Sequence, residues 1–92
     1  MTTFVCLEDY TVAPAPTFEL PEDLSRKHLR EGQLVKCVFK FGGKSERMWV
    51  LITHVMPEGV YAGILRNTPM FIPLVFGETL TFKWSNVICI AD

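Results

Sequence analysis

The sequence predicts an α+β protein that is mostly β, built as a strongly bent antiparallel sheet or small SH3-like barrel of five to six strands with one helix near the N-terminus. Two patterns lead to this prediction. From Gln33 onward, short apolar runs of strand character are separated by turn residues, whereas residues 21–31 have helical spacing with start and stop signals. Neither an internal repeat nor a linker divides the chain. We therefore expect a single domain over 1–92, with a strand and extended connector over 1–20, the helix over 21–31 and the antiparallel sheet over 33–90.

The chain before the helix contains a short strand candidate and a connector. Residues 4–7 form an apolar run that we expect to be a strand. Residues 11–17 include Pro14 and Pro16, and each proline restricts its own φ angle and the backbone of the residue before it. This stretch is therefore predicted to be extended rather than helical.

The helix over residues 21–31 is indicated by the residues at its ends. Pro21 suits the first turn, and the acidic Glu22 and Asp23 complement the positive end of the helix dipole. Gly32 is placed to end the helix. One face is expected to pack on the sheet through the stripe Leu20, Leu24, His28 and Leu29.

The next two segments predict a hairpin. Apolar residues at 35, 37, 39 and 41 alternate with Lys36 and Lys40, a pattern typical of a half-buried strand. The sequence Gly-Gly-Lys-Ser at 42–45 forms the turn. Both alternating faces of the segment 47–55 are apolar, so we expect a central strand covered by the barrel interior on one side and by the helix on the other.

The remaining chain predicts three more strands. A turn at 57–59 leads to a strand over 60–65, which the Asn-Thr-Pro sequence at 67–69 ends. An irregular apolar segment over 70–76 follows. Apolar residues at 80, 82 and 84 then alternate with Thr and Lys as a second half-buried strand, and residues 87–90 complete the sheet.

The charge is divided unevenly along the chain, although the formal net charge is only −1. Residues 1–23 hold five acidic side chains and no Lys or Arg, whereas residues 26–47 hold seven basic side chains and two acidic ones. Either the two blocks lie near each other and neutralise, or the basic block faces an acidic partner. The near-neutral total predicts no strong attraction to nucleic acid or to an anionic membrane.

The cysteines and the apolar stretches predict the compartment. Cys6, Cys37 and Cys89 are too few and too widely spaced for a zinc site or a Cys-x-x-Cys redox pair, and their odd number argues against a disulfide framework. Free thiols indicate a reducing compartment. The N-terminus lacks the pattern of a signal peptide, and the longest apolar stretch, Met70–Phe76, is too short to span a bilayer. We therefore expect a cytoplasmic protein with no metal, no cofactor and no membrane partner.

The order and spacing of several short motifs carry a family resemblance. The motifs are Glu46-Arg47-Met48-Trp49-Val50, Gly63-Ile64-Leu65, Asn67-Thr68-Pro69, Gly77-Glu78-Thr79-Leu80-Thr81-Phe82 and Ile88. Over residues 32–90 the chain thereby resembles a bacterial family of small β-rich domains of unknown function, although Gly77-Glu78 stands where that family usually has Gly-Asp. Some relatives look like immunity proteins of toxin systems. The resemblance implies a binding module rather than an enzyme, and it assigns no catalytic residue.

The segment from Asn67 to Gly77 is the strongest candidate for a binding surface. It is apolar, yet Pro69 and Pro73 prevent regular pairing in a central strand. It is therefore either a loop folded over the open end of the barrel or an exposed patch that binds a partner or a second copy of the chain. The binding residues expected at such a patch are Arg47, Trp49, Tyr61, Arg66, Asn67 and Phe71.

These observations favour a non-enzymatic protein-interaction module, with an immunity protein that blocks a toxin as its specific form. The partner is then another protein, or a second copy in a homodimer. The alternative is a nucleic-acid or small-ligand binding module, although the expected inward phase of Phe39 and Trp84 and the slightly acidic net charge argue against nucleic acid. A cysteine nucleophile is not favoured, because Cys37 and Cys89 lie in alternating apolar runs where cysteine is usually buried.

Overall fold

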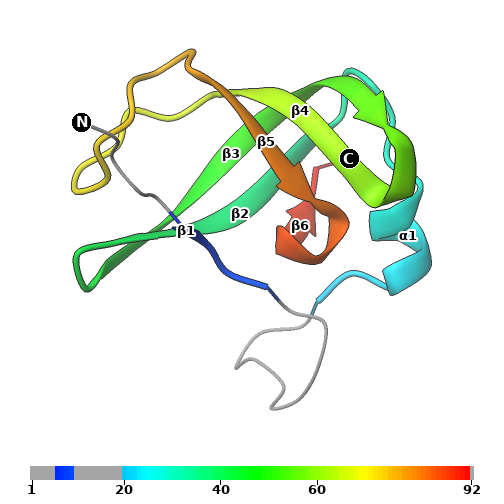
Figure 1. The fold of residues 1–92 in the computed structure, drawn as a ribbon, viewed down its shortest axis with the longest axis horizontal. Helices are drawn as coiled ribbons and strands as arrows, with labels where there is room; N and C mark the ends of the chain where they lie inside the picture. Colours follow the sequence, from blue (N-terminus) through cyan, green and yellow to red (C-terminus); the bar gives the residue numbers. More distant parts are fainter. Residues whose placement is uncertain (1–5, 10–19, 92) are drawn as a thin grey trace.

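The computed structural model describes residues 6–9 and 20–91, and this part of the chain is mostly β (Figure 1). The strands are β1 (Cys6–Leu7), β2 (Leu34–Phe41), β3 (Lys44–Met56), β4 (Val60–Leu65), β5 (Thr79–Lys83) and β6 (Val87–Ile90). One short helix, α1 (Asp23–Lys27), precedes the main strands, and two 3-10 turns, η1 (Pro57–Gly59) and η2 (Trp84–Asn86), connect later ones. The predicted mostly β, α+β class is confirmed.

Several predicted elements have the expected bounds. The strands predicted over 60–65 and 87–90 are β4 and β6. The tight turn after β2 is confirmed, since Gly42 and Gly43 have φ angles of 57° and 78°. A two-residue hairpin turn of type I′ needs positive φ at both central positions, which glycine adopts without steric cost. The connector predicted over 11–17, and the start of the strand predicted over 4–7, lie outside the described residues.

The strands form one antiparallel sheet in the order β1-β2-β3-β4-β5, and β6 pairs with β2. One edge of β2 therefore pairs with β3 along its whole length, while the other edge pairs with β1 near Phe39 and with β6 near Val35. β5 forms one edge of the sheet, and β6 lies at the other edge beside β2. Only the three residues of η2 join β5 to β6, so the sheet must bend strongly to bring the two edges together. Among the described strands β5 pairs with β4 alone, so the hydrogen-bonded sheet is not closed into a barrel.

Strands β3 and β4 pair irregularly at a point that favours such a bend. Their register shifts between Ile52 and His54, which is a β-bulge. Gly63 lies opposite Ile52 at this point. A Cβ atom on Gly63 would overlap the backbone carbonyl oxygen of Leu51 and would lie 2.8 Å from Cγ1 of Val50. Glycine is therefore required here for β4 to approach the bent part of β3.

The core lies on the concave face of the sheet. Its central side chains, each at most 2% exposed, are Val35, Cys37, Phe39, Met48, Val50, Ile52, Tyr61, Leu65 and Val87. The opposite face of β3 is less covered than predicted, since Trp49 and Leu51 are half-buried and Val55 is 50% exposed. The expectation that α1 covers this second face is wrong, because α1 packs against η2 instead.

The helix is shorter than predicted, and its buried face is different. It covers five residues rather than the expected span of 21–31. Leu24 is 67% exposed and His28 is exposed, so these two members of the predicted stripe do not face the sheet, whereas Leu29, which follows the helix, is buried in the core. The buried helical residue is Arg26, which is 2% exposed. Within residues 6–9 and 20–91, no helix has the length and apolar content needed to cross a membrane.

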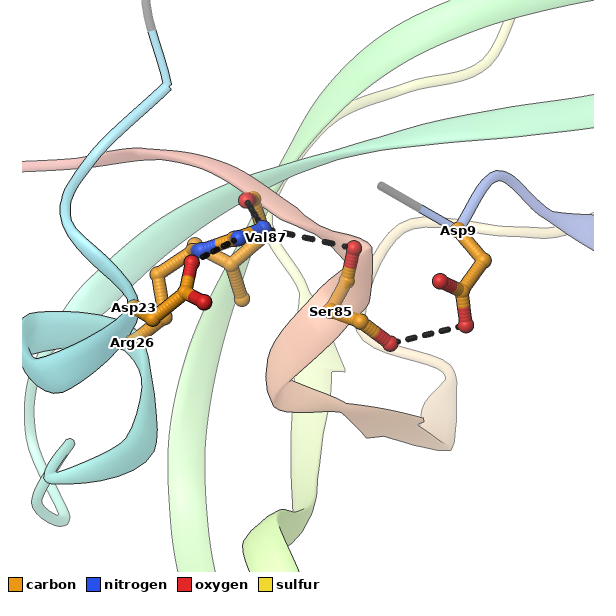
Figure 2. A network of polar contacts seen from close by, with 5 residues as sticks. All are labelled: Asp9, Asp23, Arg26, Ser85 and Val87. Carbon is orange, nitrogen blue, oxygen red and sulfur yellow. Dashed lines mark hydrogen bonds and ion pairs between the residues drawn. The ribbon is translucent and has the colours of Figure 1, made fainter. Parts of the chain in front are cut away.

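A polar network explains why Arg26 is buried (Figure 2). Nη1 of Arg26 donates to the backbone oxygens of Val87 at 3.2 Å and Ser85 at 3.5 Å, and Nη2 donates to Oδ1 of Asp23 at 2.8 Å. The Ser85 hydroxyl in turn donates to Oδ2 of Asp9 at 2.8 Å. The network thus joins α1, η2 and the segment after β1. Its charge-assisted hydrogen bonds, rather than contacts of the exposed Leu24, orient the helix.

Candidate functional site

The segment between β4 and β5, residues 66–78, forms a loop that both covers the core and exposes apolar side chains. Ile72 is buried in the core cluster, and the half-buried Leu74 packs against it. Four neighbouring residues remain exposed, with exposed fractions of 81% for Met70, 52% for Phe71, 66% for Val75 and 54% for Phe76. Part of the loop therefore covers the core and part is an exposed apolar patch, which are the two alternatives derived from the sequence.

Glu46 of β3 holds the first half of the loop. Its carboxylate accepts hydrogen bonds from three consecutive backbone N–H groups, those of Met70 at 2.9 Å, Phe71 at 2.6 Å and Ile72 at 2.8 Å. The sequence analysis named Glu46 only as part of a family motif and gave it no role. One signal was available, because Glu46 has the same strand phase as the buried Met48 and Val50, so an acidic side chain on that phase needed a polar partner.

Three further contacts fix the two ends of the loop. At its start, the Trp49 N–H donates to Oδ1 of Asn67 at 2.6 Å, and the Arg66 N–H donates to the Trp49 oxygen at 2.9 Å. At its end, the Val75 N–H donates to Oε1 of Glu78 at 3.0 Å. The exposed apolar side chains therefore project from a backbone that is hydrogen-bonded at both ends and in the middle.

Lowering the pH is expected to loosen the loop, because it protonates Glu46. The hydrogen bond from Met70, followed by those from Phe71 and Ile72, lowers the pKa of this carboxyl from its ordinary value of 4.5, while partial burial acts in the opposite direction. A carboxylate whose pKa is lowered by folding stabilises the native state above its ordinary pKa, and this contribution is lost as the pH falls through the lowered value.

Hydrogen exchange followed by NMR measures this effect. We expect the protection factors of the Met70, Phe71 and Ile72 amides to fall below pH 4.5 in the natural protein. In a Glu46→Gln variant they should be low already at neutral pH and should not change across the acidic range. Equal protection of these amides in the two proteins at neutral pH would contradict the role given to Glu46.

Three cationic side chains lie over aromatic rings on or beside the loop. Lys44 Nζ lies 4.8 Å from the centre of the Phe71 ring, and Arg66 Cζ lies 5.4 Å from that of Phe76. On the outer face of the sheet, Lys36 Nζ lies 4.7 Å from the Trp49 ring. In the described part of the chain, none of these three cations forms an ion pair with a carboxylate.

The basic block is thus neutralised only in part. Lys40 forms an ion pair with Glu8, and this contact does join the basic block to the acidic N-terminal block. Lys36 and Lys44 of the same block make no such pair with any described residue. Part of the basic block is neutralised, as the first alternative from the sequence expects, and part faces solvent, as the second expects.

The exposed residues of the loop lie beside the β2–β3 turn. Phe41, 36% exposed, is paired across this turn with Lys44, whose ammonium group reaches Phe71 in the loop. In Figure 1 the yellow and orange loop and the green β2–β3 turn are at the same end of the molecule, with α1 at the other. We call this region the loop surface and define it as Phe41, Lys44, Arg66, Met70, Phe71, Val75 and Phe76.

The residues predicted to bind a partner have different positions. Arg66 and Phe71 belong to the loop surface, and Asn67 anchors the loop to the backbone of Trp49. Arg47 and Trp49 lie on the outer face of β3, exposed and half-buried respectively. Met70, Val75 and Phe76 lie in the apolar segment that the sequence singles out, although they were not named as binding residues. Phe41 and Lys44 beside the β2–β3 turn were missed.

The prediction that Tyr61 borders the exposed patch is wrong. Tyr61 is 1% exposed, and its ring packs in the core against Phe82 with 5.7 Å between ring centres. Its hydroxyl donates to the Arg26 oxygen at 3.1 Å and accepts from the Leu29 N–H at 3.2 Å. Tyr61 therefore links the core to the end of α1 and has no free surface for a partner.

The rest of the molecule presents less defined features. An open pocket of about 370 Å³ beside α1 is lined by Lys27, His28, Glu58, Gly59 and Trp84, and one of about 490 Å³ by Arg30, Gly32, Gln33, Leu34, Ile90 and Ala91. Burial raises the pKa of the Cys37 thiol to about 12, so this thiol stays protonated at neutral pH. No group of three or more His, Cys, Asp or Glu residues is placed to hold a metal ion in residues 6–9 and 20–91.

The loop surface is therefore the best-organised candidate site in the described structure. It combines exposed apolar side chains, two cations without carboxylate partners and a backbone fixed by Glu46. No protein-family model matches this chain, and no curated protein or solved structure matches it either.

Proposed function

We propose that this protein is a non-enzymatic protein-interaction module and that the loop surface is its binding site. The observation that carries the proposal is the exposure of Met70, Phe71, Val75 and Phe76 on a loop whose backbone is held by hydrogen bonds. Grouped exposed apolar side chains on a folded protein usually mark an interaction site. A loop that is ordered before binding loses little conformational entropy when the partner arrives.

Two finer features belong to the same proposal. We infer an SH3-like arrangement of the strands, supported by the pairing of β2 with both β3 and β6 and by the short η2 link between β5 and β6. We also infer a cytoplasmic site of action, since Cys37 and the exposed Cys89 are free thiols, which persist in reducing compartments. The resemblance to immunity-protein-like relatives favours a toxin as the protein that the module binds and blocks.

A homodimer through the loop surface is a weaker form of the proposal. A two-fold interface places the same patch of both copies face to face. Lys44 and Arg66 of both copies would then lie in one interface, and like charges brought together at an interface are unfavourable. A different protein therefore fits the surface better than a second copy does.

The proposal is tested by changing the exposed apolar residues of the loop. We expect a Met70→Ser/Phe76→Ser double variant to bind the natural partner about a hundredfold more weakly, because exposed apolar anchors contribute about 1–2 kcal/mol each. Partners are captured from the source cells, identified by mass spectrometry and then titrated as purified proteins. Both side chains project into solvent, so the free energy of unfolding should change little.

A matched control changes apolar residues with similar exposure elsewhere. Leu24 on α1 and Val55 on β3 are 67% and 50% exposed, so a Leu24→Ser/Val55→Ser variant loses comparable apolar surface away from the loop. This control should bind the partner as the natural protein does. A partner that binds the Met70→Ser/Phe76→Ser variant but not the Leu24→Ser/Val55→Ser control would place the binding site away from the loop surface.

A further inference from the structure

We infer that the loop surface recognises an acidic protein segment, in which apolar side chains contact Met70, Phe71, Val75 and Phe76 and flanking carboxylates pair with Lys44 and Arg66. This inference rests on the proposed function and names the chemistry of its partner. The acidic character of the partner is inferred from the charges around the apolar residues rather than from the apolar residues themselves.

The cations of the loop surface are available to a partner. Lys44 and Arg66 lie over exposed phenylalanine rings and make no ion pair with a described residue. A ring face holds a cation in place while leaving its N–H groups free to donate. An incoming carboxylate would then form a charge-assisted hydrogen bond with a cation that is already positioned.

The acidic groups near the loop are directed toward its backbone. The Glu46 carboxylate accepts from the N–H groups of Met70, Phe71 and Ile72, and Glu78 accepts from that of Val75. Both carboxylates are therefore bound to backbone N–H groups of the loop, although Glu78 is exposed. Lys44 and Arg66 form no ion pair with a described residue, so they are the charged groups of the loop surface that remain to pair with a partner.

The same arrangement favours a protein over a single-stranded nucleic acid. Base stacking needs an uncovered aromatic face. Lys44 covers one face of the Phe71 ring, and Arg66 covers one face of the Phe76 ring. Met70 and Val75, the two most exposed apolar residues of the loop surface, are not aromatic and offer no stacking platform. The net charge of −1 also gives little general attraction to phosphate.

A phage-displayed library of random peptides tests the inference. The library is selected on the natural protein, and the enriched peptides are synthesised and titrated against three variants. The first is Lys44→Glu/Arg66→Glu, which reverses the cations, and the second is Met70→Ser/Phe76→Ser, which removes apolar anchors. The third, Arg30→Glu/Lys83→Glu, makes the same change in net charge at exposed positions outside the loop surface.

We expect the enriched peptides to combine Asp or Glu with large apolar residues. The cation-reversing variant should bind them about a hundredfold more weakly, roughly tenfold for each reversed charge, and added salt should weaken binding to the natural protein. The charge control should bind them nearly normally. This set of results would support the acidic segment as the partner.

The other outcomes separate the inference from the proposed function. Peptides without acidic residues that bind the cation-reversing variant normally, yet depend on Met70 and Phe76, would overturn the inference and leave the proposed function standing. An absence of any peptide that depends on the loop surface would overturn both. Binding of a single-stranded oligothymidine probe that disappears in the cation-reversing variant, without peptide enrichment, would assign the surface to nucleic acid.

Discussion

An Arg26→Ala variant is expected to lose about 3 kcal/mol of the free energy of unfolding. The substitution removes a buried guanidinium that donates to the backbone oxygens of Ser85 and Val87, and it leaves a cavity between α1 and η2. Buried carbonyls that lose a charged donor cost about 1–3 kcal/mol each. Because small domains have only about 5–15 kcal/mol in total, urea denaturation should show this change clearly.

An Asp23→Asn variant is the control for the ion pair within the helix. The Asp23 side chain is 65% exposed, so its pair with Arg26 is screened by solvent and should contribute less than about 1 kcal/mol. The expected order is therefore a large loss for Arg26→Ala and a small one for Asp23→Asn. Equal losses in the two variants would mean that the ion pair, rather than the contact with η2 and β6, is the main contribution of Arg26.

The Arg26 substitution should leave partner binding unchanged as long as the protein is folded. Helix α1, which contains Arg26, and the loop between β4 and β5 are at opposite ends of the molecule (Figure 1). Sites that are far apart and share no contacts usually act additively. A folded Arg26→Ala protein with weakened binding would show that the two ends are coupled.

A Gly63→Ala variant is expected to lose about 3 kcal/mol or to fail to fold. The added methyl group would overlap the backbone carbonyl of Leu51 and crowd the side chain of Val50, at the bulge where β3 bends. Backbone atoms in the middle of a paired sheet cannot move aside without breaking strand pairing. Thermal unfolding by circular dichroism, together with the yield of soluble protein, measures the result.

Gly77→Ala separates this steric effect from the conformational effect of glycine. Gly77 has a φ angle of 88°, which disfavours other residues, but open space surrounds the position of its Cβ. The expected loss is about 1–2 kcal/mol, arising from the backbone conformation alone. If Gly77→Ala were as damaging as Gly63→Ala, the close approach of β3 and β4 would not be the reason for the glycine at 63.

The sequence by itself determined the elements whose signals are local. The Gly42-Gly43 pair predicts the hairpin because a type I′ turn depends on the φ angles of those two residues alone. The alternation around Phe39 predicts the main buried face of β2, since Val35, Cys37 and Phe39 share one phase whereas both lysines of the strand lie on the other. The prolines of the segment 67–77 likewise excluded a strand without reference to the rest of the fold.

Tertiary structure decided which face of a strand is buried where both alternating faces are apolar. In β4 one phase holds Val60 and Ile64 and the other Tyr61 and Leu65, so alternation could not show that Tyr61 points inward. Pairing with β3 made that choice, because it turns the Tyr61 and Leu65 phase toward the core. The site prediction for Tyr61 failed for this reason.

The burial of Arg26 and the role of Glu46 depend on partners that are distant in sequence. Arg26 bonds to Val87, which is 61 positions away, and Glu46 bonds to Phe71, which is 25 positions away. The neighbouring sequence predicts that a charged residue in a short helix or on a strand is exposed. Only hydrogen bonds to residues distant in sequence offset the cost of burying it. The sequence thus determined the strands, the turns and the apolar loop, whereas the fold decided how the loop is held and which cations remain available on its surface.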